Sequence, residues 1–315
     1  MSDALVTVRS VSKRFDTGGG FLSRPRSMMA VRDVSLTIAK GEVVGVVGES
    51  GCGKSTFARL VLRLLQPTTG SVSFGDTDLT ALTPARLLVL RRRMAMVFQD
   101  PYSSLDPRLT LGEVIAEPYR AQGLPVPPGR VAELLAQVGL SPAMVTSYPH
   151  QLSGGQRQRA GIARALALTP EFIVLDEPTA SLDVSIQAQI VTLLEGLRDR
   201  LGLTYLFISH DLGLVRYFCD RIVVMYLGAV VEILAPDASP RHPYTRALMD
   251  STFLPDPARR RSLVALKGEI ASAFNLPPGC AFAARCDRAT DQCRITAPVL
   301  ETGSQGQALA CFHPL

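Results

Sequence analysis

A glycine-rich segment near the start of the chain has the composition of a phosphate-binding loop. It reads Gly48-Glu49-Ser50-Gly51-Cys52-Gly53-Lys54-Ser55-Thr56 and matches the pattern G-x-x-x-x-G-K-[ST]. Glycines let backbone N–H groups wrap phosphate oxygens, and Lys54 is expected to reach the β and γ oxygens of a nucleotide, with Ser55 on Mg²⁺. We call residues 48–56 the P-loop. The residues predicted to bind ATP here are Gly48, Ser50, Gly51, Cys52, Gly53, Lys54, Ser55 and Thr56.

Two carboxylates at the end of an apolar run are candidates for metal binding and for the activation of water. Asp176 and Glu177 directly follow four apolar residues at 172–175. Ligands collect at the carboxyl ends of the strands in open α/β sheets. We therefore expect Asp176 to hold Mg²⁺, directly or through water, and Glu177 to polarise the attacking water.

Buried strands and amphipathic helices must position these groups. The run Val43–Val47 before the P-loop is continuously apolar, as are residues 172–175 and 205–208, which is typical of strands covered on both faces. After the P-loop, apolar residues at helical spacing indicate a helix: Phe57, Leu60, Val61 and Leu64. The pattern predicts an α/β fold with a parallel or mixed sheet and flanking helices.

Changes in composition divide the chain. An N-terminal strand is expected at 5–12, followed by a Gly-, Ser- and Arg-rich surface loop at 17–27. From residue 100 the sequence becomes proline-rich and mainly helical, which predicts an inserted helical subdomain over about residues 100–165 within a domain of residues 1–235. Seven prolines between residues 236 and 278 predict a C-terminal extension of short elements, residues 236–315.

Composition excludes several classes of protein. Mean hydropathy is +0.19, but the longest apolar run, at 222–235, contains Glu232 and is shorter than the roughly 20 residues that span a bilayer. The net charge of +5 is carried mostly by arginine and names no partner, so no nucleic acid is expected. The start of the chain has no secretory signal pattern, which predicts a cytoplasmic, reducing location. The triplets Arg91–Arg93 and 259–261 are expected to be solvated.

Six cysteines are then not expected to form disulfides. Four of them lie close to the end of the chain with the spacing C-x5-C-x6-C-x17-C, and four thiolates suit either Zn²⁺ or a [4Fe–4S] cluster. Spacing alone does not decide between these metals, and free buried thiols are the third alternative. Cys52 and Cys219 are expected to be small buried residues.

A second glycine-rich segment, Leu152-Ser153-Gly154-Gly155-Gln156, precedes an Arg/Ala-rich helical stretch and forms another candidate anion site. With it, the chain resembles the ATP-binding subunits of the ABC transporter family, whose signature sequence this is. Gln99 after 96–98 is similar to the family's Q-loop, Ser181-Leu182-Asp183 to its D-loop, and His210 after 207–209 to its switch histidine. Phe15 resembles the aromatic residue that stacks on adenine. The order Ala180-Ser181 is often reversed in relatives.

The resemblance implies a P-loop ATPase with a mixed sheet and assigns roles. The implied catalytic residues are Lys54, Gln99, Glu177 and His210. Gln99 would join Ser55 and Asp176 on Mg²⁺, and His210 would bridge Glu177, water and the γ-phosphate. The signature residues Ser153, Gly154, Gly155 and Gln156 would act on the ATP of a second subunit, with Asp183 in the D-loop, so hydrolysis would require a dimer.

Three further stretches, at 98–107, 178–189 and 242–245, resemble the oligopeptide/dipeptide importer branch. That branch implies an ATP-hydrolysing subunit on the cytoplasmic face of the inner membrane. It would power peptide uptake through two permease subunits, beside a second, often non-identical ATPase and an extracytoplasmic substrate-binding protein. Relatives of this type imply a [4Fe–4S] cluster at Cys280, Cys286, Cys293 and Cys311. The alternatives are the same machine carrying nickel, glutathione or another small solute, and a soluble non-transport ATPase.

Overall fold

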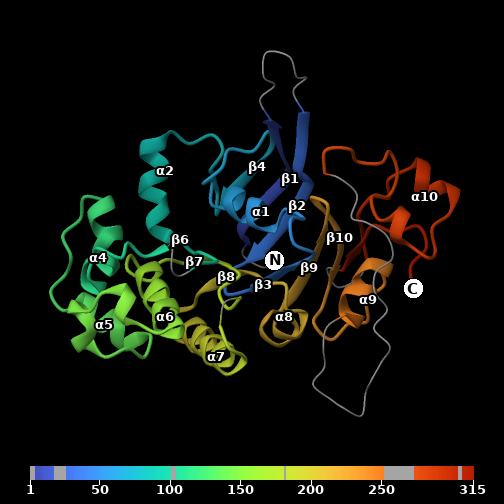
Figure 1. The fold of residues 1–315 in the computed structure, drawn as a ribbon. Helices are drawn as coiled ribbons and strands as arrows, with labels where there is room; N and C mark the ends of the chain where they lie inside the picture. The colour runs from blue at the N-terminus through green and yellow to red at the C-terminus, as the bar shows by residue number, and fades with distance from the viewer. Residues whose placement is uncertain (1–3, 18–25, 101–103, 181, 252–272, 304–306) are drawn as a thin grey trace, which may run out of the picture. The chain divides into compact units, whose positions relative to one another are not determined.

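The structure is a computed structural model and describes residues 4–17, 26–100, 104–180, 182–251, 273–303 and 307–315 (Figure 1). The chain divides into two compact units, and each is described by itself. Unit 1 comprises residues 1–5, 39–43 and 81–209, and unit 2 comprises residues 6–38, 44–80 and 210–315. Most of the surface loop expected at 17–27, the triplet at 259–261, residues 101–103 and Ser181 lie outside the described residues.

Three parallel strands form the sheet of unit 1. They are β6 (Met94–Val97), β7 (Phe172–Asp176) and β8 (Thr204–Ile208), in the order β8-β7-β6. Every residue of β7 and β8 is buried, which confirms the strands predicted from the apolar runs. Because β7 is covered on both faces, its register is fixed, and Asp176 comes at its carboxyl end.

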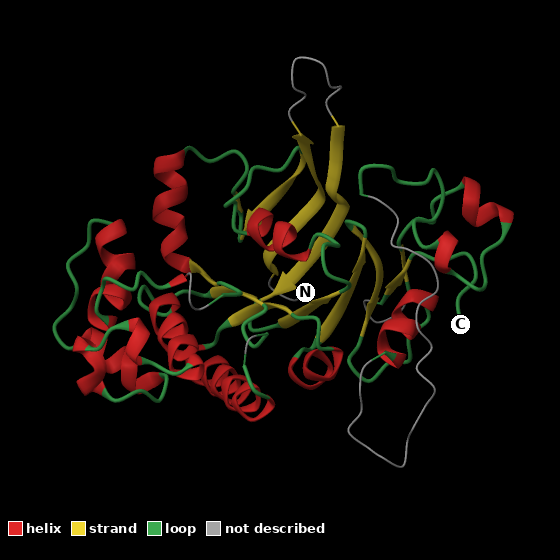
Figure 2. Ribbon diagram, in the orientation of Figure 1, coloured by secondary structure: helices red, strands yellow, loops and turns green. Residues whose placement is uncertain are grey.

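Helices make up most of the rest of unit 1. They are α2 (Pro84–Leu90), η1 (Arg91–Arg93), α4 (Leu111–Ala121), α5 (Arg130–Gln137), η2 (Pro142–Thr146), η3 (Pro149–Gln151), α6 (Gly154–Ala165) and α7 (Val184–Leu201). Among the described residues from 104 to 165 there is no strand (Figure 2). Thr110 and Glu113 form a capping box that begins α4, and Tyr119 on α4 donates a hydrogen bond to the Ala167 carbonyl. The hydrogen bond of Tyr119 joins α4 to the chain that follows α6.

Unit 2 contains all or most residues of two groups of strands. The first consists of β1 (Ala4–Thr17), β2 (Arg26–Ala39), β4 (Thr69–Phe74) and β5 (Thr77–Asp78), in the order β2-β1-β4-β5. The second consists of β3 (Val43–Val47), β9 (Arg221–Tyr226), β10 (Ala229–Leu234), β11 (Glu301–Thr302) and β12 (Ala308–Leu309), in the order β11-β12-β10-β9-β3. β3 pairs in parallel with β9, whereas β10 is antiparallel to both β9 and β12. The mixed sheet predicted from the sequence is thus confirmed.

The helices of unit 2 are short. They are α1 (Lys54–Val61), α8 (Leu212–Phe218), α9 (Pro243–Asp250), η5 (Ala283–Arg285) and α10 (Asp291–Ile295). The helix predicted from Phe57 to Leu64 is correct in type but ends at Val61, and Leu64 is 43% exposed. Arg63 adopts a φ of 54°, a left-handed conformation that turns the chain out of the helix.

The apolar run at 222–235 forms most of β9 and β10, and both strands are buried apart from their first residues. None of the helices in the described part of the chain combines the length and apolarity needed to cross a bilayer.

Candidate functional site

The P-loop connects β3 to α1 in unit 2 and has the shape of a tight cradle. Gly48, Gly51 and Gly53 have φ values of 153°, 77° and 105°. A Cβ at Gly48 would lie 2.3 Å from the Met225 carbonyl oxygen, and one at Gly53 would lie 2.2 Å from that of Ala30. These two positions therefore need glycine, because neighbouring backbone leaves no room for a side chain. The first turn of α1 contains no acidic residue, so its N–H groups and helix dipole are suited to an anion.

Lys54 is the first residue of α1, and its side chain turns back over the loop. It is 5% exposed, and Nζ donates to the carbonyl oxygens of Gly48 at 2.8 Å and Glu49 at 3.1 Å. The ammonium is thus held within the P-loop by its own backbone. Ser55 and Thr56 are half-buried in the same turn. Cys52 is buried, and desolvation raises the pKa of its thiol, which fits a small packing residue rather than a nucleophile.

In unit 1 the structure brings two of the predicted catalytic side chains together. Gln99, two residues after β6, donates a hydrogen bond from Nε2 to Glu177 Oε2 at 3.0 Å. Asp176 is 3% exposed at the end of β7. Glu177 has a φ of 46°, a left-handed conformation that is rare for a residue with a Cβ, and its N–H donates to the Ile208 carbonyl. Neighbouring strands therefore fix the backbone of Glu177 and aim its carboxylate at Gln99.

The signature segment begins α6. Ser153 is the N-cap residue, its Oγ accepts from the N–H of Gln156, and Gln156 Oε1 accepts from the N–H of Ser153. This capping box occupies the two polar side chains of the segment. Gly155 allows close packing, since a Cβ there would lie 2.8 Å from Ile186 on α7. The helix predicted to follow this segment is confirmed, and it begins within the segment, at Gly154.

The remaining predicted residues lie at exposed or half-buried positions. Asp183 is exposed and precedes α7, without a side-chain hydrogen bond to that helix. His210 is exposed at the start of the last segment of unit 2. Phe15 lies on β1, and Lys13 Nζ is 5.2 Å from its ring centroid. The structure therefore places Lys54, His210 and Phe15 in unit 2, and Gln99, Asp176, Glu177, Asp183 and the signature residues in unit 1.

The prediction of a [4Fe–4S] cluster at Cys280, Cys286, Cys293 and Cys311 is wrong. Among the residues that the structure describes, no group of three or more His, Cys, Asp or Glu side chains is arranged to hold a metal ion, which also removes the zinc alternative. The four residues line one small cavity with Phe282 and Phe312. Burial raises the pKa of the Cys280, Cys286 and Cys311 thiols and so favours protonated thiols over the thiolates that bind metals.

These cysteines instead pack with apolar residues of the C-terminal region. The Cys280 N–H donates to the Cys293 carbonyl at 2.7 Å, and Sγ of Cys293 lies 3.6 Å from Oγ1 of Thr290. A Cβ at Gly279 would lie 2.2 Å from the Cys293 carbonyl oxygen, so the turn there is tight. None of the six cysteines, all of which lie in the described part of the chain, forms a disulfide bond, and Cys219 is buried as expected.

An ion pair between a P-loop residue and a distant arginine was not among the predicted features. Glu49 occupies a variable position of the motif, and its carboxylate is paired with Arg285 through two hydrogen bonds of 2.8 and 2.9 Å. The partner lies 236 positions away and has no motif of its own. One signal was present: a carboxylate inside a loop built for phosphate requires a cation nearby.

Known proteins match this chain along almost its entire length. Residues 31–180 match the family described as ABC transporter, and residues 231–293 match the family described as oligopeptide/dipeptide transporter, C-terminal region. A probable peptide ABC transporter ATP-binding protein of Sinorhizobium fredii is 49% identical over 99% of this chain and 90% of its own length. An oligopeptide transport ATP-binding protein of Salmonella typhimurium is 44% identical over 98% of this chain and 96% of its own length.

Solved structures agree with this fold. A dimeric bacterial ABC transporter cassette matches with a TM-score of 0.65 and 31% identity, over 74% of this chain and 100% of the cassette. An ATP-binding cassette dimer bound to ADP and Pi matches with a TM-score of 0.63 and 32% identity, over the same shares. The chain therefore belongs to the ATP-binding proteins of the ABC transporter family. Within that family, the match of its C-terminal region puts it in the oligopeptide/dipeptide branch.

Proposed function

We infer that this chain is the ATP-hydrolysing subunit of a peptide importer and that it drives the uptake of oligopeptides or dipeptides through separate membrane subunits. The observation that carries this inference is the match to peptide-transport ATP-binding proteins over 98% or more of the chain, which includes the C-terminal region as well as the ATPase motifs. Domain boundaries at residues 1–235 and 236–315, with a helical subdomain inserted at about residues 100–165, remain part of this proposal.

The P-loop residues fit the triphosphate of ATP. The loop has two glycines that cannot accept a Cβ, a buried ammonium at Lys54, and a helix start without acidic residues. Hydroxyl, carboxylate and amide oxygens are the ligands that Mg²⁺ prefers, so Ser55, Asp176 and Gln99 are the residues proposed to hold that ion. When bound, Mg²⁺ neutralises charge that develops on the phosphate oxygens.

The proposed reaction is the transfer of the γ-phosphoryl group of ATP to water. Glu177 orients the water and accepts its proton while the water oxygen forms a bond to phosphorus and the bond to the ADP oxygen breaks. Gln99 donates to the Glu177 carboxylate and so fixes its orientation. His210 is proposed to donate a hydrogen bond to the γ-phosphate, and Lys54 to stabilise the charge of the β and γ oxygens. Phe15 is proposed to stack on adenine.

We propose that two ATPase subunits act together. The signature segment from Ser153 to Gln156 and the D-loop Asp183 would face the nucleotide of the second subunit, which this branch commonly supplies as a non-identical chain. The proposed partners are that second ATPase and two permeases, with an extracytoplasmic substrate-binding protein that acts on the permeases. This arrangement puts the chain at the cytoplasmic face of the membrane as a peripheral subunit.

The catalytic assignment is tested with Glu177→Gln. We expect phosphate release by the complex to fall by about 100-fold or more, because the proposed base is lost, while ATP affinity is retained and a nucleotide-bound dimer accumulates. The matched control is Glu195→Gln on α7, which removes the same charge from a half-buried position in unit 1. Turnover of Glu177→Gln at the wild-type rate would refute the role given to this carboxylate.

The transport assignment is tested by uptake in cells that lack this chain. We expect uptake of labelled peptides of defined length to be lost, restored by the wild-type chain, and not restored by Lys54→Ala. Uptake of free amino acids by other routes serves as the control. Normal peptide uptake together with lost uptake of nickel or glutathione would assign the machine to another solute.

A further inference from the structure

The C-terminal region of this chain is attached directly to the P-loop through one charged side chain. Arg285 Nη1 and Nη2 donate to Glu49 Oε2 and Oε1 at 2.8 and 2.9 Å, and both residues belong to unit 2. The Arg285 side chain is 5% exposed and that of Glu49 is 19% exposed. Glu49 in turn holds the pKa of Arg285 above its usual value. Such a bidentate, desolvated pair fixes both side chains in one geometry.

A second contact reaches the backbone of the same P-loop residue. The N–H of Glu49 donates to Tyr244 Oη at 2.9 Å. Tyr244, Tyr226 and Phe282 pack with ring centroids 4.7 to 5.4 Å apart, and all three are at most 2% exposed. Arg285 donates a further hydrogen bond to Tyr226 Oη at 3.3 Å. An aromatic cluster therefore holds both groups that contact Glu49.

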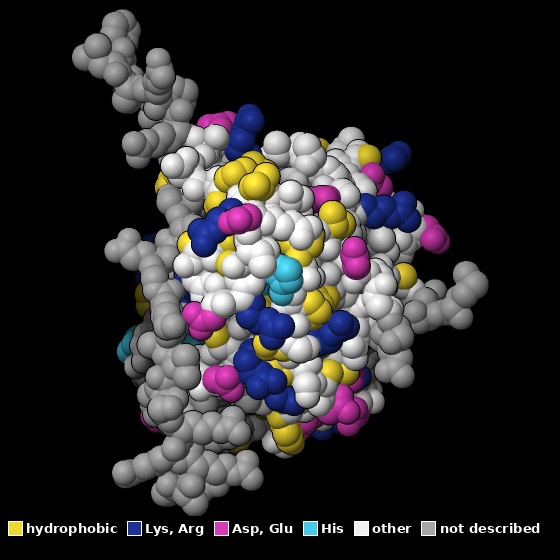
Figure 3. Space-filling view, turned by 90° about the vertical axis from the view of Figure 1, so that its right-hand side faces the viewer, with side chains coloured by type: hydrophobic (Ala, Val, Ile, Leu, Met, Phe, Trp, Pro, Cys, Tyr) yellow, Lys and Arg dark blue, Asp and Glu magenta, His cyan; other side chains and the backbone are white. Residues whose placement is uncertain are grey.

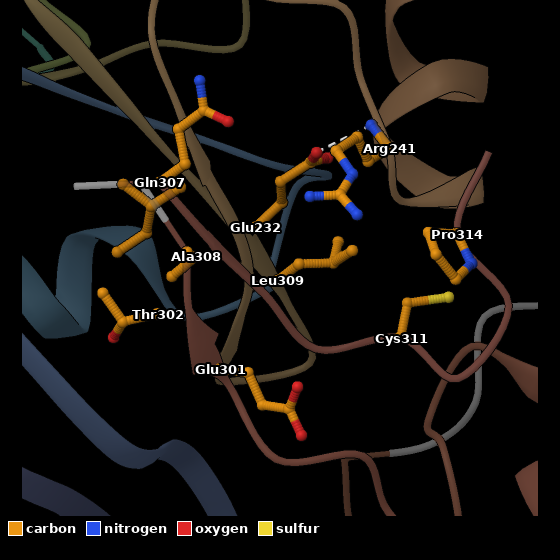
Figure 4. A pocket seen from close by; sticks show the side chains of 11 residues that line it. Glu232, Arg241, Glu301, Thr302, Gln307, Ala308, Leu309, Cys311 and Pro314 are labelled. Atoms are coloured by element: carbon orange, nitrogen blue, oxygen red, sulfur yellow. Dashed lines mark hydrogen bonds between the residues drawn. The ribbon is translucent and has the colours of Figure 1, made fainter. Parts of the chain in front are cut away.

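Tyr244 is itself fixed by a buried carboxylate on β10. Glu232 is 2% exposed, and one of its oxygens accepts from the N–H of Arg241 at 2.7 Å (Figure 4). The other oxygen accepts from the N–H of His242 at 3.1 Å. His242 is the N-cap of α9, and its Nδ1 accepts from the N–H of Tyr244 at 3.0 Å. The start of α9 cannot shift without breaking these bonds, so the position of the Tyr244 hydroxyl is determined by the sheet.

The clamped residue also controls the ammonium of the P-loop. Lys54 Nζ donates to the carbonyl oxygens of Gly48 and Glu49, so the place of the ammonium depends on how the Glu49 backbone is held. The negative charge of the Glu49 carboxylate must also be neutralised before a nucleotide can bind. A free carboxylate in this loop would repel a triphosphate, and Arg285 neutralises it.

We propose that Arg285 and Tyr244 are positioning residues of the nucleotide site. They hold Glu49 so that Lys54 meets the phosphates, and Arg285 cancels the charge that would otherwise oppose them. The proposal rests on the nucleotide site inferred above. It extends that site beyond residues 31–180, the part matched to ABC transporters, to two residues of the C-terminal region.

Other arginines of the C-terminal region offer a comparison. Basic side chains are visible on the surface of this region, with acidic ones scattered among them (Figure 3). Arg294 on α10 is exposed, whereas Arg285 is buried. Arg294→Gln thus removes the same charge from the same region without touching the P-loop.

The test measures binding of a fluorescent ATP analogue with Mg²⁺ to the full-length chain, and the KM and kcat of the assembled complex. For Arg285→Gln we expect Kd and KM for ATP to rise about tenfold while kcat at saturation changes little, because ground-state binding is lost. Arg294→Gln is expected to match the wild type. A merely structural role would lower kcat through loss of folded protein and leave KM unchanged, and that result would overturn the proposal.

A second substitution tests the charge argument. Glu49→Gln combined with Arg285→Gln removes the carboxylate that Arg285→Gln alone would leave without its cation. It leaves two amides that can pair, so we expect ATP affinity to recover to within about threefold of wild type. A double variant that binds ATP as weakly as Arg285→Gln alone would overturn the role of charge.

If Arg285→Gln does not fold, the ATP affinity of Tyr244→Phe tests the proposal, since this substitution removes only the acceptor for the Glu49 N–H. An unchanged Kd in Tyr244→Phe would then overturn the proposal. A wild-type chain that binds no ATP would refute the nucleotide site itself.

Discussion

The buried histidine at the start of α9 predicts a specific loss of stability in acid. His242 is 1% exposed, and desolvation lowers the pKa of its imidazole from 6.5 to about 4, against a smaller opposing effect of a hydrogen bond with the Ala310 backbone. The folded protein therefore keeps the ring neutral at a pH where the unfolded chain protonates it. Protons bind preferentially to the unfolded chain, and stability falls as the pH drops below 6.5.

The size of the loss follows from the two pKa values. The difference between 6.5 and about 4 corresponds to about 3 kcal/mol once the pH is below both values. At pH 5, where the unfolded histidine is almost fully protonated and the folded one is mostly neutral, the expected loss is about 2 kcal/mol. Because the side chain is fully enclosed, solvent screening does not reduce this figure.

The assay is urea unfolding of the wild type and of His242→Asn at pH 7.5 and pH 5, at constant ionic strength. Asparagine can accept the Tyr244 N–H as the histidine Nδ1 does, and it is a favoured N-cap residue, so the variant removes the titration and keeps the cap. Other groups titrate equally in both proteins. We expect the wild type to lose about 2 kcal/mol more than His242→Asn between the two pH values. Equal losses would refute the reasoning.

Two further substitutions test local features of the fold. Gly53→Ala is expected to weaken ATP binding by more than about tenfold, because its Cβ would meet the Ala30 carbonyl. Gly75→Ala, with open space around its Cβ, is expected to bind ATP normally in the same titration. Equal affinities of the two variants would contradict the tight fit described for the P-loop. Thr110→Ala is expected to lower the free energy of unfolding by about 1 kcal/mol, because the N-cap of α4 is lost. Thr192→Ala, at an exposed position of α7, is expected to lower it by less than about 0.5 kcal/mol. Equal changes in urea unfolding would argue against a stabilising role of the Thr110 cap.

The strands that carry the site could be predicted because each is buried along its whole length. An uninterrupted apolar run such as Val43–Val47 is incompatible with an exposed face, and the residues that follow it must lie at the end of the strand. The ends of long strands were harder to predict. The expected strand at 5–12 extends from Ala4 to Thr17, because its exposed half is polar and resembles a loop in composition.

The side-chain pairings could not be predicted, because sequence spacing gives no distance between residues far apart in the chain. Cysteine spacing suggested a metal cluster that the described residues do not form. Of the basic triplet at η1, which was expected to be solvated, Arg93 is exposed. Its pairing with Glu171 and the hydrogen bond from Arg92 to Gln122 gave no signal in the sequence. The bond between Glu49 and Arg285 depends on how β10 and the chain after it return to the P-loop.

The left-handed backbone of Glu177 affects what would happen if this protein were selected for greater thermal stability. A φ of 46° costs a residue with a Cβ roughly 1–3 kcal/mol, a cost that glycine largely avoids and asparagine tolerates better. Selection for heat resistance alone would therefore favour replacements at this position that abolish the carboxylate. Given the role proposed for Glu177, a thermostable variant obtained without a simultaneous demand for peptide uptake would be well folded and inactive if it had lost this carboxylate, and position 177 is the first place to inspect in such a sequence.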